Sequence, residues 1–435
     1  MNSPFFARLG RVWPRLAFLG AVSSITFCGA ARADLPFGTS MVGIHQGNWQ
    51  SIADYEAATL QSQNLKRSRI TMSYSSDPAQ LGELISKCEA RGIKPMLMVE
   101  YYTHFGPLAR NGQTIYDFWR SLGRDLATRY GTRLSHYSAF NEPDLGLFWD
   151  GNQANFQDAR GYIPPADYFQ AVKGFADGVR SVNTSFKVIP GGFAGFNLHG
   201  DWTFKGYVPV LAPLLNDGTL DGLNIHSYNV DLSSLERQQQ YQFSRVKQEN
   251  GITRDINHYC TEWNSDRGPI GEKTFLTRLW DSMGVVGNGG NGSAPKTAIS
   301  MPYTLFDTET NSSHGMAVSE RPFVPSQRAL THKLVVDLTA GMSFHSLEPL
   351  ETGLFSLVGN NKKMWVWQNI SATRNGRPIW SALAGNRLAL GGIPSDATNV
   401  KIYRFNSTLA VPFRTIPTRG CYELSRALTR LLSMR

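Results

Sequence analysis

The sequence predicts an α/β protein, a (β/α)₈ TIM barrel with a β-sandwich domain appended at its C-terminal end. Eight short apolar runs alternate with amphipathic segments, as in a barrel of parallel βα units. After about residue 335 the chain changes to short β-rich runs separated by turn residues, which is typical of a sandwich. We therefore expect three parts: a signal peptide over residues 1–33, a catalytic barrel over 34–330, and the sandwich with a tail over 331–435.

The N-terminal 33 residues have the pattern of a secretory signal peptide. Three arginines within residues 8–15 precede the apolar run 16–27, and Ala31-Arg32-Ala33 matches an Ala-x-Ala cleavage site. We expect cleavage near Ala33 and a mature chain that is secreted or periplasmic. Retention of this segment as a membrane anchor is the alternative, although the apolar run is short for a bilayer span.

Composition excludes several classes of protein. Hydrophobic residues make up 41% of the chain, enough for a large core, so disorder is not expected. The signal segment holds four Arg and no acid, so the mature net charge is (43 − 4) − 34 = +5. With no dense Lys/Arg block, nucleic acid is not an expected partner. The mature cysteines are Cys88, Cys260 and Cys421, without a CxxC pattern, so neither a disulfide scaffold nor a zinc site is predicted.

The eight strand-like runs alternate with helical spacing. Residues 77–92 begin with Asp77-Pro78, place apolar residues one helical turn apart, and end at Gly92. Residues 115–131 and 164–183 read in the same way. The competing arrangement is an open doubly wound sheet, but no Gly-rich phosphate loop follows the first run, which disfavours a nucleotide-binding version. The expected strands are residues 41–45, 67–74, 94–102, 136–143, 187–195, 220–229, 257–264 and 298–307.

The last hundred residues read as short strands joined by Gly, Asn, Pro and Asp turns, which favours a sandwich of about 90 residues. The final fifteen residues form either a short helix or a tail. The β-rich runs begin at residues 342, 354, 362, 399 and 408.

Polar residues gather where the barrel strands are expected to end. In a parallel barrel the carboxyl ends of the strands form the active face. Glu142 ends the fourth run and Glu262 ends the seventh. Two carboxylates in an aromatic-lined mouth suit cleavage of a glycosidic bond, which needs a proton donor and a second carboxylate. The other candidate substrate-binding residues are Arg69, Asn141, Trp149, His226, Tyr228, Trp263 and Tyr303, whereas Glu100 is expected to be structural.

Two motifs carry a family resemblance. "FNEPD" at residues 140–144 and "TEWN" at residues 261–264 resemble the clan A glycoside hydrolases. Within that clan the chain is most similar to family 39, and there to bacterial endoglycosidases that act on exopolysaccharides of the biofilm matrix. The resemblance covers about residues 38–320, and the sandwich more loosely. One departure is Tyr303 or Phe306 on the eighth strand, where many clan members have Trp.

The resemblance implies a role for each matched residue. Glu142 becomes the acid/base and Glu262 the nucleophile of a retaining mechanism. Asn141 would bind the 2-hydroxyl of the sugar, and Arg69 would support the nucleophile. His226 would line the site beside them, together with Tyr228.

The resulting hypothesis is a retaining glycoside hydrolase, endo-acting on a bacterial exopolysaccharide. We expect no cofactor, no metal, no membrane span in the mature chain, and a monomer. An exo-acting, β-xylosidase-like glycosidase is one alternative. A non-catalytic carbohydrate-binding protein and an envelope polysaccharide biogenesis protein are the others. The sequence leaves the sugar, the linkage and the oligomeric state open.

Overall fold

The computed structural model describes the barrel strands, most helices that follow them, and the late antiparallel strands. The described residues are 39–42, 49–73, 78–100, 111–145, 163–193, 202–228, 247–264, 275, 297–303, 316–319, 324–340, 342–347, 354–359, 362–367, 373–374, 377–378, 399–405 and 410–417. The expected signal peptide and the C-terminal tail lie outside them.

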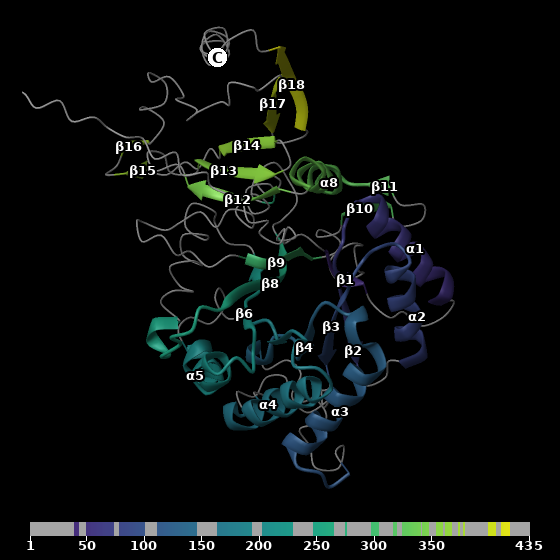
Figure 1. Ribbon diagram of the computed structural model, residues 1–435, viewed down its shortest axis with the longest axis vertical. Coiled ribbons are helices and arrows are strands. Elements are labelled where there is room, and N and C mark those ends of the chain that lie inside the picture. The colour runs from purple at the N-terminus through teal and green to yellow at the C-terminus, as the bar shows by residue number, and fades with distance from the viewer. Residues whose placement is uncertain are drawn as a thin grey trace, which may run out of the picture. The chain divides into compact units, whose positions relative to one another are not determined.

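Two parallel sheets form the barrel (Figure 1). The first pairs its five strands in chain order. In the second, β6 and β7 both pair with β8 and so share one strand position, and β8 pairs with β9. The strands are β1 (Thr39–Val42), β2 (Ser68–Ser73), β3 (Met96–Glu100), β4 (Tyr137–Ala139), β5 (Val188–Pro190), β6 (Gly222–Asn224), β7 (Ser227–Tyr228), β8 (Asn257–Asn264) and β9 (Thr297–Pro302).

The two sheets meet at both of their edges. A parallel bridge between Phe193 and Ile225 joins the β5 side to the β6 side, and β1 lies beside β9. Eight strand positions therefore follow one another around the barrel. Each overlaps the run predicted for it, which confirms the parallel α/β architecture.

Helices follow the first five strands one by one, and the three segments predicted as helical are confirmed as α2, α3 and α4. Helix α8 comes after β9 and the short hairpin of β10 (Ala317–Ser319) and β11 (Val324–Pro325). No described helix combines the length and the apolar character needed to cross a membrane. The helices are α1 (Trp49–Ser62), α2 (Pro78–Glu89), α3 (Ile115–Tyr130), α4 (Pro165–Val182), α5 (Trp202–Asn216) and α8 (Gln327–Thr339).

Helices α3 and α4 cross closely because α4 presents glycines to its neighbour. A Cβ built on Gly174 would lie 2.4 Å from the carbonyl oxygen of Tyr116, and one on Gly178 would lie 2.1 Å from that of Arg120. Both distances are far below van der Waals contact, so the crossing requires glycine at these positions. The two helices behind the β4 end of the barrel are thus packed backbone against backbone.

The barrel strands divide their side chains between two layers. Met96, Ile189, Tyr259 and Ile299 come from four different strands and pack together, which only the barrel interior allows. Leu97 and other alternate residues belong to the outer core under the helices. Since successive strand residues face opposite sides, β3 turns Glu100 toward the same interior as Met96. On β2, Ile70 and Met72 are in the outer core, so Arg69 also faces inward.

The late β-rich runs form strands, and these strands pair antiparallel. β12 (Met342–Leu347), β13 (Leu354–Gly359) and β14 (Lys362–Trp367) form one three-stranded sheet. β17 (Asn399–Phe405) and β18 (Ala410–Pro417) form a hairpin, and β15 (Thr373–Arg374) pairs with β16 (Arg377–Pro378). The packing of these sheets into a sandwich stays a prediction. The expected boundary at residues 330/331 falls inside α8, and the three-stranded antiparallel sheet begins only after that helix ends.

Candidate active site

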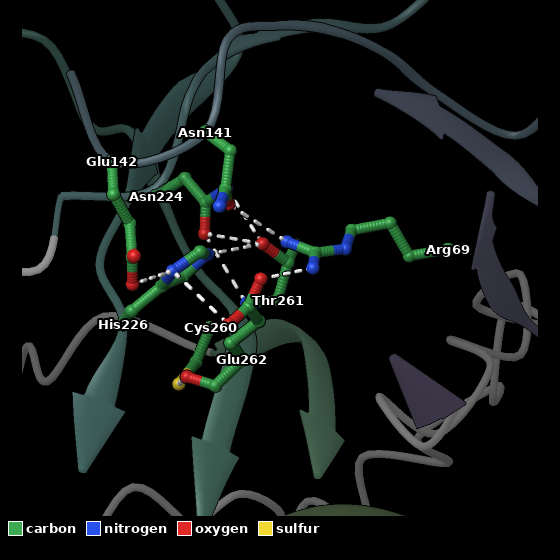
Figure 2. Close-up of polar contacts among 8 residues, drawn as sticks. All are labelled: Arg69, Asn141, Glu142, Asn224, His226, Cys260, Thr261 and Glu262. Carbon is green, nitrogen blue, oxygen red and sulfur yellow. Dashed lines mark hydrogen bonds and ion pairs between the residues drawn. The ribbon is translucent and has the colours of Figure 1, made fainter. Parts of the chain in front are cut away.

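Polar side chains from both sheets meet inside the barrel, at the carboxyl ends of its strands. Figure 2 shows Arg69, Asn141, Glu142, His226 and Glu262 pointing toward one another. These are five of the nine residues that the sequence singles out. Asn224 and Thr261 join them through His226, and Cys260 contacts the backbone of Glu262.

The turn after β4 holds Glu142 in an unusual backbone conformation. Phe140 has φ of 72° and Glu142 has φ of 45°, both in the left-handed region that residues other than glycine rarely adopt. Two hydrogen bonds fix this turn: Phe140 N–H donates to Val99 O at 2.8 Å, and Glu142 N–H donates to Gly192 O at 2.8 Å. The Phe140 ring is buried and packs on the Trp119 ring, with the two ring centroids 4.4 Å apart. Strained backbone held in this way is concentrated at functional sites.

Glu262 is buried in an ion pair with Arg69. The side chains are 6% and 1% exposed, and the guanidinium also donates to Asn141 Oδ1 at 3.2 Å. A buried carboxylate requires such compensation, and the positive charge favours its ionised form. Arg69 was expected at the end of its strand, but it is the second residue of β2. It reaches the site because its long side chain runs inward through the barrel.

His226 lies between the two acids. Its Nδ1 is 2.8 Å from Glu142 Oε1 and 3.8 Å from Glu262 Oε2, and the imidazole is fully buried. Gly192 makes room for the ring, since a Cβ there would lie 1.9 Å from His226 Nε2. One carboxylate oxygen of Glu142, one of Glu262 and a ring nitrogen of His226 all lie within 4.8 Å of one another.

This cluster has the donor set of a metal site, but its surroundings do not suit a cation. Glu262 already pairs with the Arg69 guanidinium, so a divalent ion here would lie against a fixed positive charge. We therefore assign no metal to these residues. The expectation of a metal-free and cofactor-free reaction stays a prediction.

An irregularity in β8 places two adjacent residues in the site. The register of β8 against β9 shifts between Cys260 and Trp263, and the Cys260 thiol donates to the Glu262 carbonyl oxygen at 3.4 Å. Thr261 and Glu262 consequently both face the interior, whereas a regular strand would send one of them outward. Bulges of this kind are common next to active sites, where they redirect a side chain.

The same irregularity explains where the structure departs from the prediction for Trp263. Its side chain is 2% exposed, lies in the outer core, and packs on Phe275 with ring centroids 5.0 Å apart. The indole N–H donates to Ser300 Oγ at 2.9 Å. Trp263 therefore packs between barrel and helices and is not a platform for a sugar ring.

The structure gives less detail on the other three predicted site residues. Tyr303 follows β9, is partly buried, and donates its backbone N–H to Trp263 O at 2.9 Å. Tyr228 ends β7 and pairs in register with Asn264. Trp149 lies outside the described residues.

Glu100 is a third carboxyl group near the site, although the sequence suggested only a structural role. Its pKa is raised to about 7, chiefly by burial and also by the negative charges of Glu262 and Glu142, while the charges of Arg69 and His226 oppose the shift. Strand alternation is the signal that could have found it, because Met96 and Glu100 share a face of β3. Asn224 and Thr261 were also missed.

Comparison with a solved β-glycosidase supports the fold, and two further glycosidases resemble the chain more loosely. The β-glycosidase BGL167 superimposes with a TM-score of 0.51 at 12% identity, covering 74% of this chain and 99% of that one. An endo-1,4-β-mannanase from Rhizomucor miehei gives 0.47 at 13% identity, with coverages of 71% and 95%. A β-glucosidase from Pyrococcus furiosus gives 0.48 at 11%, with coverages of 67% and 84%.

No family model and no curated protein sequence matches the chain. At these identities the likeness to BGL167 establishes a shared barrel fold. The chemistry has to be argued from the site itself.

Proposed function

We propose that the protein is a retaining glycoside hydrolase. The observation that carries the proposal is the pair of carboxylates from Glu142 and Glu262, with oxygens within 4.8 Å of each other across His226. Retaining enzymes hold their two carboxyl groups roughly 5–5.5 Å apart, while inverting enzymes need roughly 6.5–9.5 Å to admit a water molecule. The separation here favours direct attack by one carboxylate.

The surroundings of the two acids suggest their roles. Glu262 is the more buried and is paired with Arg69, which favours the charged form that a nucleophile needs. Glu142 is 12% exposed and is held by His226. In the first step Glu262 attacks the anomeric carbon while Glu142 protonates the departing oxygen. In the second, Glu142 deprotonates a water molecule that releases the sugar from Glu262.

The finer assignment extends this proposal. A family 39 enzyme that acts inside bacterial exopolysaccharide chains fits the motifs at residues 140–144 and 261–264, the signal-peptide pattern and the appended β-rich region. Such an enzyme would be secreted or periplasmic and would act as a monomer. An exo-glycosidase is the alternative with the same chemistry, whereas a non-catalytic carbohydrate-binding protein would have no need for a strained acid beside a second, ion-paired one.

Activity and substrate can be tested together. The mature chain would be incubated with activated aryl glycosides, bacterial exopolysaccharides and plant β-glycans, and the products sized. Oligosaccharides of several units are expected from a polysaccharide; release of monosaccharides alone would reject endo action. Proton NMR of the first product formed should show the anomeric configuration of the substrate, and inversion would refute the retaining mechanism.

Azide can separate the two acids. In Glu142→Ala, azide should attack the glycosyl-enzyme without needing a base, which gives a glycosyl azide of retained configuration. In Glu262→Ala, azide should attack the substrate directly and give the inverted product. The reverse pattern would exchange the two roles, and unchanged turnover in both variants would reject the catalytic assignment. Asp221→Asn, a change at the residue directly before β6 and away from the site, provides a matched loss of a buried carboxylate.

A further inference from the structure

On the side of His226 that faces away from Glu142, two further polar residues complete a buried network. Thr261 Oγ1 lies 2.9 Å from His226 Nε2 and 2.8 Å from Asn224 Nδ2. The exposed fractions are 0% for Thr261, 1% for Asn224 and 0% for His226. Figure 2 shows this chain running from Asn224 through Thr261 and His226 to Glu142.

The backbone fixes the orientation of the Asn224 amide. The N–H of Thr261, which can only donate, lies 3.2 Å from Asn224 Oδ1. The oxygen of the amide must therefore face the strand, and the amide nitrogen must face the Thr261 hydroxyl. Asn224 Nδ2 donates to Thr261 Oγ1, and the hydroxyl accepts that bond.

The single hydroxyl hydrogen of Thr261 has two acceptors within reach. These are His226 Nε2 at 2.9 Å and Asn224 Oδ1 at 3.1 Å, and the latter already accepts the backbone N–H. Which of the two accepts the hydroxyl hydrogen depends on the protonation of the other ring nitrogen, Nδ1. A carboxylate oxygen of Glu142 lies 2.8 Å from Nδ1, so when Glu142 is ionised this hydrogen bond forms only if Nδ1 carries the proton. A neutral imidazole then leaves Nε2 bare, and it needs a donor.

We propose that Asn224 and Thr261 are positioning residues that set the tautomer of His226, so that its Nδ1–H is presented to Glu142 whenever Glu142 is charged. The hydroxyl of Thr261 supplies the donor that Nε2 needs, and Asn224 holds that hydroxyl in place. The consequence for catalysis rests on the proposed function, in which Glu142 is charged when it acts as the base of the second step. Fixing the tautomer of a histidine through its far nitrogen is a general means of orienting the near one.

Nitrogen-15 NMR can read the tautomer without any substrate. Protein labelled at histidine would be measured at about pH 8.5, where ordinary carboxyl groups are ionised. The His226 signals are identified by their loss in His226→Gln. The wild type should carry its proton on Nδ1 with Nε2 bare. Thr261→Val, which replaces the hydroxyl by a methyl group, should shift protonation toward Nε2 or give a mixture, whereas Thr261→Ser should match the wild type.

The proposal is overturned by a wild-type proton on Nε2, or by a Thr261→Val spectrum identical to that of the wild type. Thr261→Ser also controls for misfolding, because it changes the packing at the same buried position by removing a methyl group while it keeps the hydroxyl. These spectra are informative even if the chain hydrolyses no glycoside, so the tautomer and the proposed function can fail separately.

Turnover of an activated aryl glycoside tests the catalytic consequence. With a good leaving group the first step needs little acid catalysis, so kcat reports the step in which Glu142 is the base. In Thr261→Val the altered tautomer should cost the hydrogen bond from His226 Nδ1–H to the charged Glu142. This loss should lower kcat roughly tenfold to hundredfold, with KM little changed. Thr261→Ser should recover most of the loss. An altered tautomer with unaltered kcat would show that this pair does not serve catalysis.

Discussion

The raised pKa of Glu100 makes a quantitative prediction about stability. The carboxyl titrates at about 7 in the folded protein against 4.5 for an ordinary glutamate. A difference of one in pKa is worth about 1.36 kcal/mol, so the folded state disfavours the charged carboxyl by roughly 3 kcal/mol. Glu100→Gln removes that charge and keeps the shape of the side chain.

The sign follows from proton binding. Below pH 4.5 the carboxyl is protonated in both the folded and unfolded states, so its ionisation contributes nothing. Between pH 4.5 and about 7 the folded protein binds more protons than the unfolded chain, so the wild type loses stability as the pH rises. Above pH 7 the full penalty is present. Relative to its value at pH 4, the stability of Glu100→Gln minus that of the wild type should therefore grow by about 3 kcal/mol by pH 8.

Urea unfolding, followed by tryptophan fluorescence with refolding verified, would measure this difference at several pH values. Taking the difference between variant and wild type cancels the titrating groups that do not interact with Glu100. Glu89→Gln is the matched control: Glu89 is exposed on α2 and pairs with Arg133, and such surface pairs contribute at most about 1 kcal/mol. A difference for Glu100→Gln that does not change with pH, or that falls as the pH rises, would refute the reasoning.

Three further substitutions test the geometry. Gly192→Ala should push a Cβ into the buried His226 imidazole and lower kcat by about a hundredfold. Gly82→Ala is the control, because its Cβ would lie 3.8 Å from the nearest atom, and it should keep full activity. Equal activity in both variants would contradict the close approach of Gly192 to the imidazole. Asp221→Asn weakens two cation contacts at 2.8 and 2.9 Å and should cost about 3 kcal/mol in urea while kcat/KM stays constant. Arg69→Gln should cost about 3–5 kcal/mol, because it leaves the Glu262 carboxylate buried without its counter-ion. Removing that carboxylate as well should recover part of the loss, and a double variant that is no more stable would argue against the pair.

The strand order and the positions of Glu142 and Glu262 could be predicted because both depend on local pattern. Apolar runs mark the barrel strands, and residues that directly follow a buried run, such as Glu142, must lie at its end. Once the parallel barrel is assumed, Glu142 and Glu262 are brought to the same face by topology alone. The same reasoning located His226.

The parts that could not be predicted depend on contacts between strands. Arg69 reaches the site from the first half of β2 by the length of its side chain, which position along a strand does not indicate. Trp263 was misjudged because one irregular step in β8 reverses which residues face inward. Nothing in the sequence marks Asn224 and Thr261, because the hydrogen bonds between them form only when β6 and β8 are paired.

The candidate site lies across the seam between the two parallel sheets, so its activity would report whether the two halves of the barrel are assembled. Residues up to 193 contain Arg69 and Glu142, and the rest of the chain contains His226 and Glu262. The ion pair of Arg69 with Glu262 and the hydrogen bond of His226 with Glu142 both cross this seam. A chain divided between β5 and β6 would yield two pieces with one of the two acids each, neither able to complete the proposed double displacement. Turnover regained on mixing them would measure the association of two half-barrels directly.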